Sequence, residues 1–138
     1  MTFFLQLHRF HKRYMQRLTS MLAGHELSNA NWSLMQYLAN EELATMSQIA
    51  KYWDVEKPTV SANVKTLTKR ELIQLKQGND RREKYISLTE KGEKLYENIS
   101  PEIKFLQDQL LNNLTDEQQE LFKKALSDME KILKEGLE

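Results

Sequence analysis

The sequence predicts a mainly α-helical protein with one small β-hairpin. Between Thr45 and Lys69, apolar residues recur at helical spacing in two runs that a short polar break separates. Two runs of strand-forming residues follow, with a polar turn between them. Two helices across a tight turn, followed by a hairpin, make a winged helix-turn-helix, and long helical patterns flank it on both sides.

The first helix of the pair is predicted to begin after Thr45. Thr45 and Gln48 have the spacing of a capping box, in which each side chain satisfies a free backbone amide of the other. The residues that follow at helical spacing give this helix one apolar face: Met46, Ile49, Ala50 and Trp53. Because Ala50 is small, a second helix is expected to cross closely at this point.

The second helix, here called the recognition helix, is predicted to start at Lys57 or Pro58, since proline is favoured in a first helical turn. Val60, Val64 and Leu67 form its buried stripe. Its outward residues are small, polar or basic, which suits a helix lying in the major groove of DNA: Thr59, Ser61, Ala62, Asn63, Lys65, Thr66 and Lys69. An ordinary amphipathic helix with a solvated face would show the same pattern.

The hairpin, here called the wing, is predicted from strands at residues 72–76 and 84–88. The turn between them carries two adjacent arginines, Arg81 and Arg82. A basic hairpin directly after a recognition helix is placed to contact the DNA backbone or the minor groove. The alternative is that these arginines pair with Asp80 or Glu83 as ordinary surface charge.

These residues resemble the MarR (multiple antibiotic resistance regulator) family of bacterial transcription regulators. The resemblance rests on the helix-turn-helix spacing, on Asp80-Arg81-Arg82 and on Leu88-Thr89-Glu90-Lys91-Gly92, and it covers nearly the whole chain. It implies a homodimeric winged-helix protein that binds a pseudo-palindromic operator and is often released by a small ligand. It also implies that Arg82 enters the minor groove with Asp80 orienting it, and that a short strand lies near Ala44.

The chain departs from the family pattern at two places. Many members carry arginines on the recognition helix where this chain has Ala62 and Thr66. Many have glycine before the first wing strand, where this chain has Glu71. Because glycine usually supplies a left-handed helix end, Glu71 predicts a different geometry at that end.

Charge is unevenly distributed along the 138 residues, although the formal net charge is zero. Residues 51–94 carry eleven basic and seven acidic side chains, whereas residues 95–138 carry five and ten. The basic excess therefore lies on the segment expected to face phosphates. No cysteine is present, which excludes disulfides and a thiol-based oxidation sensor. No membrane span or secretory signal is read, so a cytoplasmic location is expected.

The flanking segments predict dimerisation helices, which divide the chain into residues 1–27, the winged helix-turn-helix at 28–94, and residues 95–138. A helix is expected from Phe3 to Ala23, a second after the N-cap Ser28, and a last one after Thr115. A long helix capped by Thr89 contains Pro101, where it should bend or break. Pairing of both ends across a two-fold axis would bury their apolar residues, although a monomer could pack them internally.

Other kinds of site find little support. His8 and His11 lack carboxylates at ligand spacing, so no metal site is expected. No glycine-rich phosphate loop, nucleophile-elbow motif or Ser/His/Asp pattern is read, so no cofactor or enzyme activity is expected. A small-molecule effector pocket is implied by the family resemblance, and its candidate lining residues are His11, Met15, Trp32, Met35 and Gln36. The apolar members of this set would equally serve as core.

The combined interpretation is a sequence-specific transcription regulator that binds double-stranded DNA, more specifically a homodimeric repressor of a pseudo-palindromic operator that a small effector releases. Base readout is assigned to Thr59, Ser61, Asn63, Lys65 and Thr66. Wing and phosphate contacts are assigned to Lys57, Lys69, Asp80, Arg81, Arg82 and Lys84. A winged helix that serves as a protein-docking adaptor is the competing interpretation.

Overall fold

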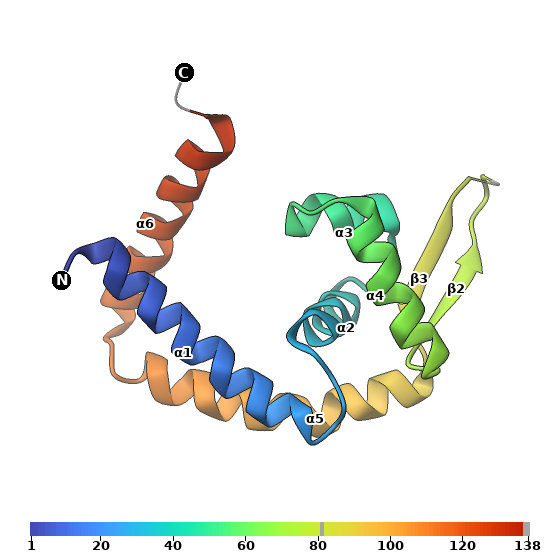
Figure 1. Ribbon diagram of the computed structural model, residues 1–138, viewed down its shortest axis with the longest axis horizontal. Helices are drawn as coiled ribbons and strands as arrows, with labels where there is room; N and C mark the ends of the chain where they lie inside the picture. Colours follow the sequence, from blue (N-terminus) through green and yellow to red (C-terminus); the bar gives the residue numbers. More distant parts are fainter. Residues whose placement is uncertain (81, 137–138) are drawn as a thin grey trace. The chain divides into compact units, whose positions relative to one another are not determined.

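A computed structural model of the chain describes residues 1–80 and 82–136; Arg81 and residues 137–138 lie outside this description. The elements in order are α1 (Phe3–Ala23), α2 (Asn29–Glu41), β1 (Ala44–Thr45), α3 (Met46–Trp53), α4 (Lys57–Lys69), β2 (Ile73–Gln77), β3 (Lys84–Leu88), α5 (Glu90–Leu111) and α6 (Asp116–Glu135) (Figure 1). The chain forms two compact units, Met1–Ser100 and Pro101–Glu138. The predicted fold class, mainly α with a small β-wing, is confirmed.

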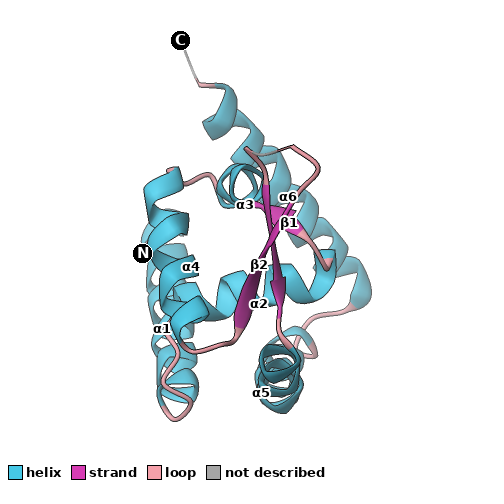
Figure 2. Cartoon of the chain, turned by 90° about the vertical axis from the view of Figure 1, so that its right-hand side faces the viewer, coloured by secondary structure: helices cyan, strands magenta, loops and turns pink. Residues whose placement is uncertain are grey.

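A three-stranded antiparallel sheet accompanies the helix-turn-helix, in the order β1-β3-β2 (Figure 2). The wing hairpin pairs Leu75 with Ile86, and β1 pairs Ala44 with the same Ile86 on the other edge of β3. The short strand expected near Ala44 is therefore present. Because β1 leads straight into α3, the sheet joins the start of the helix-turn-helix to the wing.

Local sequence signals set the helix starts as predicted. Thr45 and Gln48 form both bonds of a capping box at α3, and Thr115 and Gln118 do so at α6. At α2 the box is completed by Asn31, whose side chain accepts from the Ser28 amide while Ser28 Oγ accepts from the Asn31 amide. Each box satisfies amides that the first helical turn leaves without an intrahelical partner.

The core of the first unit fixes the rotation of α4 about its own axis. Val60, Val64 and Leu67 are buried, as the stripe predicts, among apolar residues of the other elements. Those contributed by α2 include Leu34, Met35 and Leu38, which are almost completely inaccessible. With one stripe of α4 committed to this core, its opposite side is left facing solvent.

The end of α4 corrects one sequence prediction. Glu71 adopts the left-handed conformation, with φ +60°, that glycine would usually supply. The Leu72 amide donates to the Leu67 carbonyl at 3.0 Å, and the Glu71 amide donates to Thr68 at 2.9 Å. This is the bond pattern of a Schellman motif, so the expectation of a different end geometry was wrong. The surrounding bonds hold the glutamate in the less favoured conformation.

The first turn of α5 packs against this same corner. Thr89 Oγ1 accepts from the Gly92 amide at 3.0 Å and donates to the Glu71 carbonyl at 2.6 Å. A Cβ at Gly92 would overlap the Leu72 carbonyl oxygen. The threonine and glycine of the Leu-Thr-x-x-Gly motif therefore have separate physical roles, one as a helix cap and one as a close packing point.

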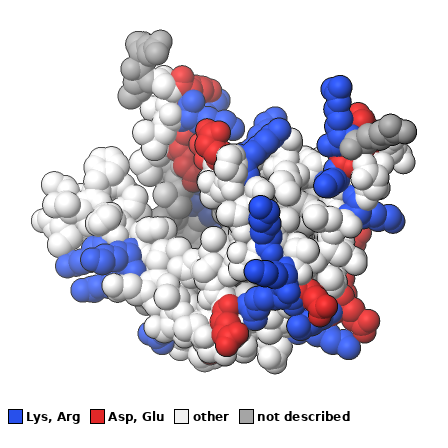
Figure 3. All heavy atoms as spheres, turned by 45° about the vertical axis from the view of Figure 1, so that its right-hand side comes forward, with Lys and Arg blue, Asp and Glu red and all other residues white. Residues whose placement is uncertain are grey.

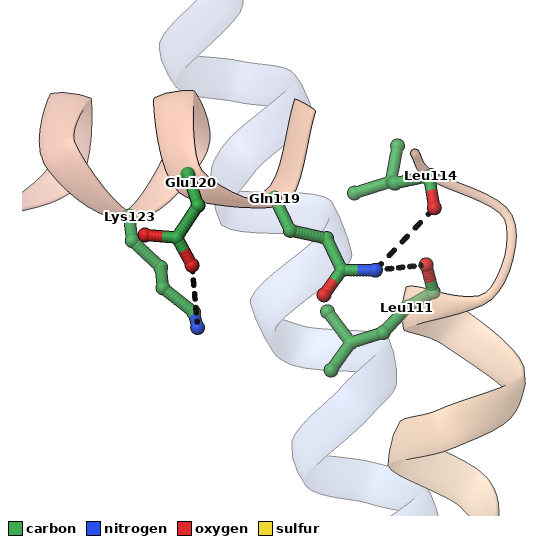
Figure 4. Close-up of polar contacts among 5 residues, drawn as sticks. All are labelled: Leu111, Leu114, Gln119, Glu120 and Lys123. Atoms are coloured by element: carbon green, nitrogen blue, oxygen red, sulfur yellow. Dashed lines mark hydrogen bonds and ion pairs between the residues drawn. The ribbon is translucent and has the colours of Figure 1, made fainter. Parts of the chain in front are cut away.

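In the second unit, Gln119 closes the turn between α5 and α6. Its side-chain amide donates to the carbonyls of Leu111 at 3.0 Å and Leu114 at 3.3 Å, next to an ion pair of Glu120 with Lys123 (Figure 4). No described residue of α6 is buried, and Leu133 is 80% exposed. The helix α5 is not broken at Pro101, although the boundary between the units falls immediately before it.

We expect Glu71→Gly to stabilise the protein, because glycine adopts positive φ without the steric penalty that a side chain carries. The free energy of unfolding should rise by about 0.5–1 kcal/mol in urea titrations with an unchanged m value. Glu71→Ala is the matched control, since alanine keeps the Cβ and should change stability little. Equal effects of the two substitutions would contradict the argument from strain.

Candidate nucleic-acid interface

The solvent-facing side of α4 carries most of the residues assigned to base readout. Thr59, Lys65 and Thr66 are exposed and Ser61 is partly exposed. Thr66 Oγ1 donates to the Ala62 carbonyl at 3.1 Å, so this hydroxyl already has one partner within the helix. The remaining member, Asn63, is turned toward α2, where its side-chain amide makes two hydrogen bonds.

Basic side chains surround this polar face. Lys57 and Lys69 lie at the two ends of α4, and Lys84 begins the second wing strand. Within the described ranges 1–80 and 82–136, no ion pair engages these three lysines. Figure 3 shows Lys and Arg side chains over the centre of the face that carries the wing and around the wing itself, with acidic side chains among them. The ammonium groups are thus available to phosphates.

At the wing tip, Asp80 shapes the backbone. Its Oδ1 accepts from the Arg82 amide at 3.1 Å, and its carbonyl accepts from the Glu83 amide at 3.0 Å. The Gly78 amide donates to the Glu83 carbonyl at 2.9 Å, which closes the turn. Asp80 therefore orients Arg82 through the main chain, while Arg81 lies outside the described residues.

The Arg82 guanidinium forms no ion pair within the described wing. Glu83, the acidic residue next to it, instead accepts a hydrogen bond from the Tyr85 hydroxyl at 3.2 Å. The charge of Glu83 and this bond raise the pKa of Tyr85. Across the described wing, no ion pair forms with Arg82. The alternative in which Arg82 is tied up by Glu83 is not what the structure contains.

Close packing of Gly78 also defines the wing. A Cβ at this position would lie 2.7 Å from Cε2 of Tyr85. The tyrosine ring thus covers the start of the turn, and its position depends on the absence of a side chain there. The turn sequence alone gave no sign that glycine serves close packing here rather than a left-handed conformation.

The candidate effector residues differ widely in exposure. Met35 is completely buried, and Trp32 is buried and stacks on Tyr96 with ring centroids 5.0 Å apart. Met15 and Gln36 are partly exposed and His11 is exposed. A hollow of about 210 Å³ beside α4 is lined by other residues, among them Trp53, Val55 and Thr59. The effector pocket therefore remains a prediction.

Sequence reasoning missed two residues that hold α4. Asn31 is 8% exposed and donates through Nδ2 to Asn63 Oδ1. Arg70 donates from Nη1 to the Glu26 carbonyl at 2.6 Å and from Nη2 to His25 at 3.1 Å. The Arg70 partners lie 44 and 45 residues away in sequence, and no local pattern reveals such contacts.

Comparison with known proteins gives this surface a context. A family model described as a winged helix DNA-binding domain matches residues 27–92. An uncharacterized HTH-type transcriptional regulator of Bacillus subtilis (strain 168), YwoH, is 35% identical over 96 residues, which cover 70% of each chain. No helix within the described ranges is long and apolar enough to cross a membrane.

Two solved structures share the fold. The S. aureus MepR–DNA complex matches with a TM-score of 0.86 and 25% identity, covering 95% of this chain and 97% of MepR. NadR in complex with 4-hydroxyphenylacetate matches with a TM-score of 0.81 and 25% identity, covering 96% and 94% of the two chains. One neighbour was thus solved with DNA and the other with a small aromatic acid.

We expect Asp80→Ala to loosen the wing tip, because the Arg82 amide loses its side-chain acceptor. Hydrogen exchange at the Arg82 amide should accelerate about fivefold, which corresponds to roughly 1 kcal/mol of local opening free energy. Asp80→Asn retains the Oδ1 acceptor and should exchange at nearly the wild-type rate. An equally fast amide in the asparagine variant would show that the charge, not the hydrogen bond, holds the turn.

Proposed function

Because the chain belongs to the MarR family of HTH-type transcriptional regulators, we propose that it is a homodimeric repressor released from DNA by a small effector. The chain is a transcriptional regulator with a winged helix DNA-binding domain at residues 27–92. The operator would be pseudo-palindromic, matching the two-fold symmetry of the dimer. The protein would act in the cytoplasm, where bacterial DNA is located.

One observation carries the DNA-binding proposal: a polar, solvent-facing side of α4 adjoins a wing whose Arg82 has no ion-pair partner among the described residues. Thr59, Ser61, Lys65 and Thr66 would contact base edges in the major groove. Arg82 would enter the minor groove, with Asp80 holding the turn that presents it. The phosphate contacts would come from Lys57, Lys69, Arg81 and Lys84.

Exposed apolar residues at both ends of the chain support the homodimer. Phe4 is 70% exposed on α1, and Phe3 and Phe10 are exposed on the same helix. On α6, Leu121, Phe122 and Leu133 are exposed as well. Burying such side chains is favourable, and residues 1–27 and 95–138 would do so across a two-fold axis. The recognition helices would then lie roughly 34–36 Å apart, one turn of DNA.

An effector would release the protein from DNA by changing the distance between the two recognition helices. A ligand that favours another dimer geometry would shift the population away from the DNA-binding form. The solved complex of NadR with 4-hydroxyphenylacetate supports a small organic effector for this chain as well. The candidate residues remain those named from the sequence, on α1 and α2: His11, Met15, Trp32, Met35 and Gln36.

The first test is selection of bound duplexes from a random pool, with wild type, Arg82→Ala and Arg82→Lys in parallel. Wild type should enrich a palindrome with half-sites about 10 base pairs apart. Arg82→Ala should lose about 1–3 kcal/mol, or roughly 5- to 160-fold in affinity for it. Arg82→Lys keeps the charge but not the planar fork, so it should recover only part of this loss.

The second test is the salt dependence of operator binding. Lys69→Ala should weaken binding to all duplexes alike and reduce the slope of log affinity against log salt by about 0.9. Lys131→Ala on α6 removes the same charge far along the chain and should leave the slope unchanged. An intact dimer without enriched sequences or steep salt dependence would instead favour the protein-docking adaptor.

A further inference from the structure

A chain of hydrogen bonds joins the start of α2 to the middle of the recognition helix. Asn31 Oδ1 accepts from the Ser28 amide at 3.0 Å, and Asn31 Nδ2 donates to Asn63 Oδ1 at 2.6 Å. Asn63 Nδ2 in turn donates to the Ala30 carbonyl at 2.8 Å. The two asparagines are 32 residues apart, so this is a tertiary contact between two helices.

The backbone partners fix the orientation of both side-chain amides. The Ser28 amide can only donate, so the oxygen of Asn31 must face it and the nitrogen must face Asn63. The Ala30 carbonyl can only accept, so the nitrogen of Asn63 must face it. Flipping either amide would place two donors or two acceptors opposite each other. Each donor of the two side-chain amides therefore faces an acceptor, and each acceptor faces a donor.

We propose that Asn31 is a positioning residue for DNA binding, and that it acts through Asn63 to hold α4 in its reading orientation. The inference rests on the proposed DNA-binding function. Asn31 lies on α2 and is buried, so it offers no surface to DNA. Asn63, assigned from the sequence to base readout, uses both polar atoms of its amide within the protein. These two bonds anchor the amide group of Asn63 to α2 instead of leaving it extended toward a ligand.

Small movements of α4 should matter because base readout needs side chains placed to within about 0.5 Å. The apolar stripe fixes the roll of the helix but resists sliding along its axis less well, since apolar contacts are not directional. The Asn31–Asn63 bond is directional and lies near the middle of α4. A second tie, from Arg70 to His25 and Glu26, holds its C-terminal end.

The decisive variant is Asn31→Asp, which keeps the size of the side chain and the acceptor for the Ser28 amide. A carboxylate is also favoured in the first turn of a helix, so the cap of α2 survives. The donor to Asn63 is lost, and a negative charge is introduced at a buried position. We expect operator affinity to fall roughly tenfold, with base preference weakened at all read positions of the half-site together and an unchanged salt slope.

Asn63→Ala provides an independent variant, because it removes the Asn31–Asn63 hydrogen bond by changing the partner that is partly exposed. It should reproduce the roughly tenfold loss, and the double variant should lose no more than either single one. Thr66→Ala is the control for a base contact and should relax the preference at one position of the half-site. Wild-type affinity in Asn31→Asp, or a preference relaxed at one base by Asn63→Ala, would overturn the proposal.

Hydrogen exchange gives a readout that needs no DNA. In Asn31→Asp, backbone amides of α4 should exchange about tenfold faster while those of α2 keep their protection. If wild type binds no duplex, the repressor proposal fails, and this measurement still decides whether Asn31 holds α4 in place. Unchanged protection of α4 would then reject it.

Discussion

The recognition helix must be buried along one side and bare along the other, and the rest of the first unit depends on this division. Val60, Val64 and Leu67 commit one stripe of α4 to the core. The stripe recurs at four and three residues, so the remaining positions necessarily form a continuous outer face. The same burial that stabilises the unit therefore decides which side chains can meet a ligand as large as DNA.

Leu72 links that helix to the wing. Its amide caps the end of α4, its carbonyl accepts from the Thr89 amide at 3.1 Å, and its side chain is buried. Gly92 has no Cβ, so the Leu72 carbonyl can pack closely against it. The Thr89 hydroxyl donates to the carbonyl of the neighbouring Glu71. One residue thus relates the recognition helix, the wing and the start of α5. The wing arginine and the α4 face can be presented together because a single rigid corner holds both.

The sequence predicted the features that depend on neighbours along the chain. Capping boxes at Thr45 and Thr115 and the spacing of the α4 stripe are local signals, and each was found where expected. Glu71 misled because its left-handed geometry is imposed by bonds from Leu72 and Thr89 rather than by its own preference. The partners of Asn31 and Arg70 lie 32 and 44 residues away, where no periodicity reports them.

The segment between α1 and α2 connects the proposed dimer helix to the recognition helix. Asn29 Nδ2 donates to Thr19 Oγ1 on α1 at 3.0 Å, next to the point where Asn31 and Ala30 hold Asn63. Arg70 reaches the same segment from the end of α4. A displacement of α1 against α2 would therefore strain the hydrogen bonds that position α4. The wing, which lies further along the chain, would be affected only after α4. With Ala62 and Thr66 in place of long basic side chains, α4 has little reach to compensate for a shift. The bonds of Asn29, Ala30 and Asn31 therefore connect α1, α2 and α4 in one hydrogen-bonded region.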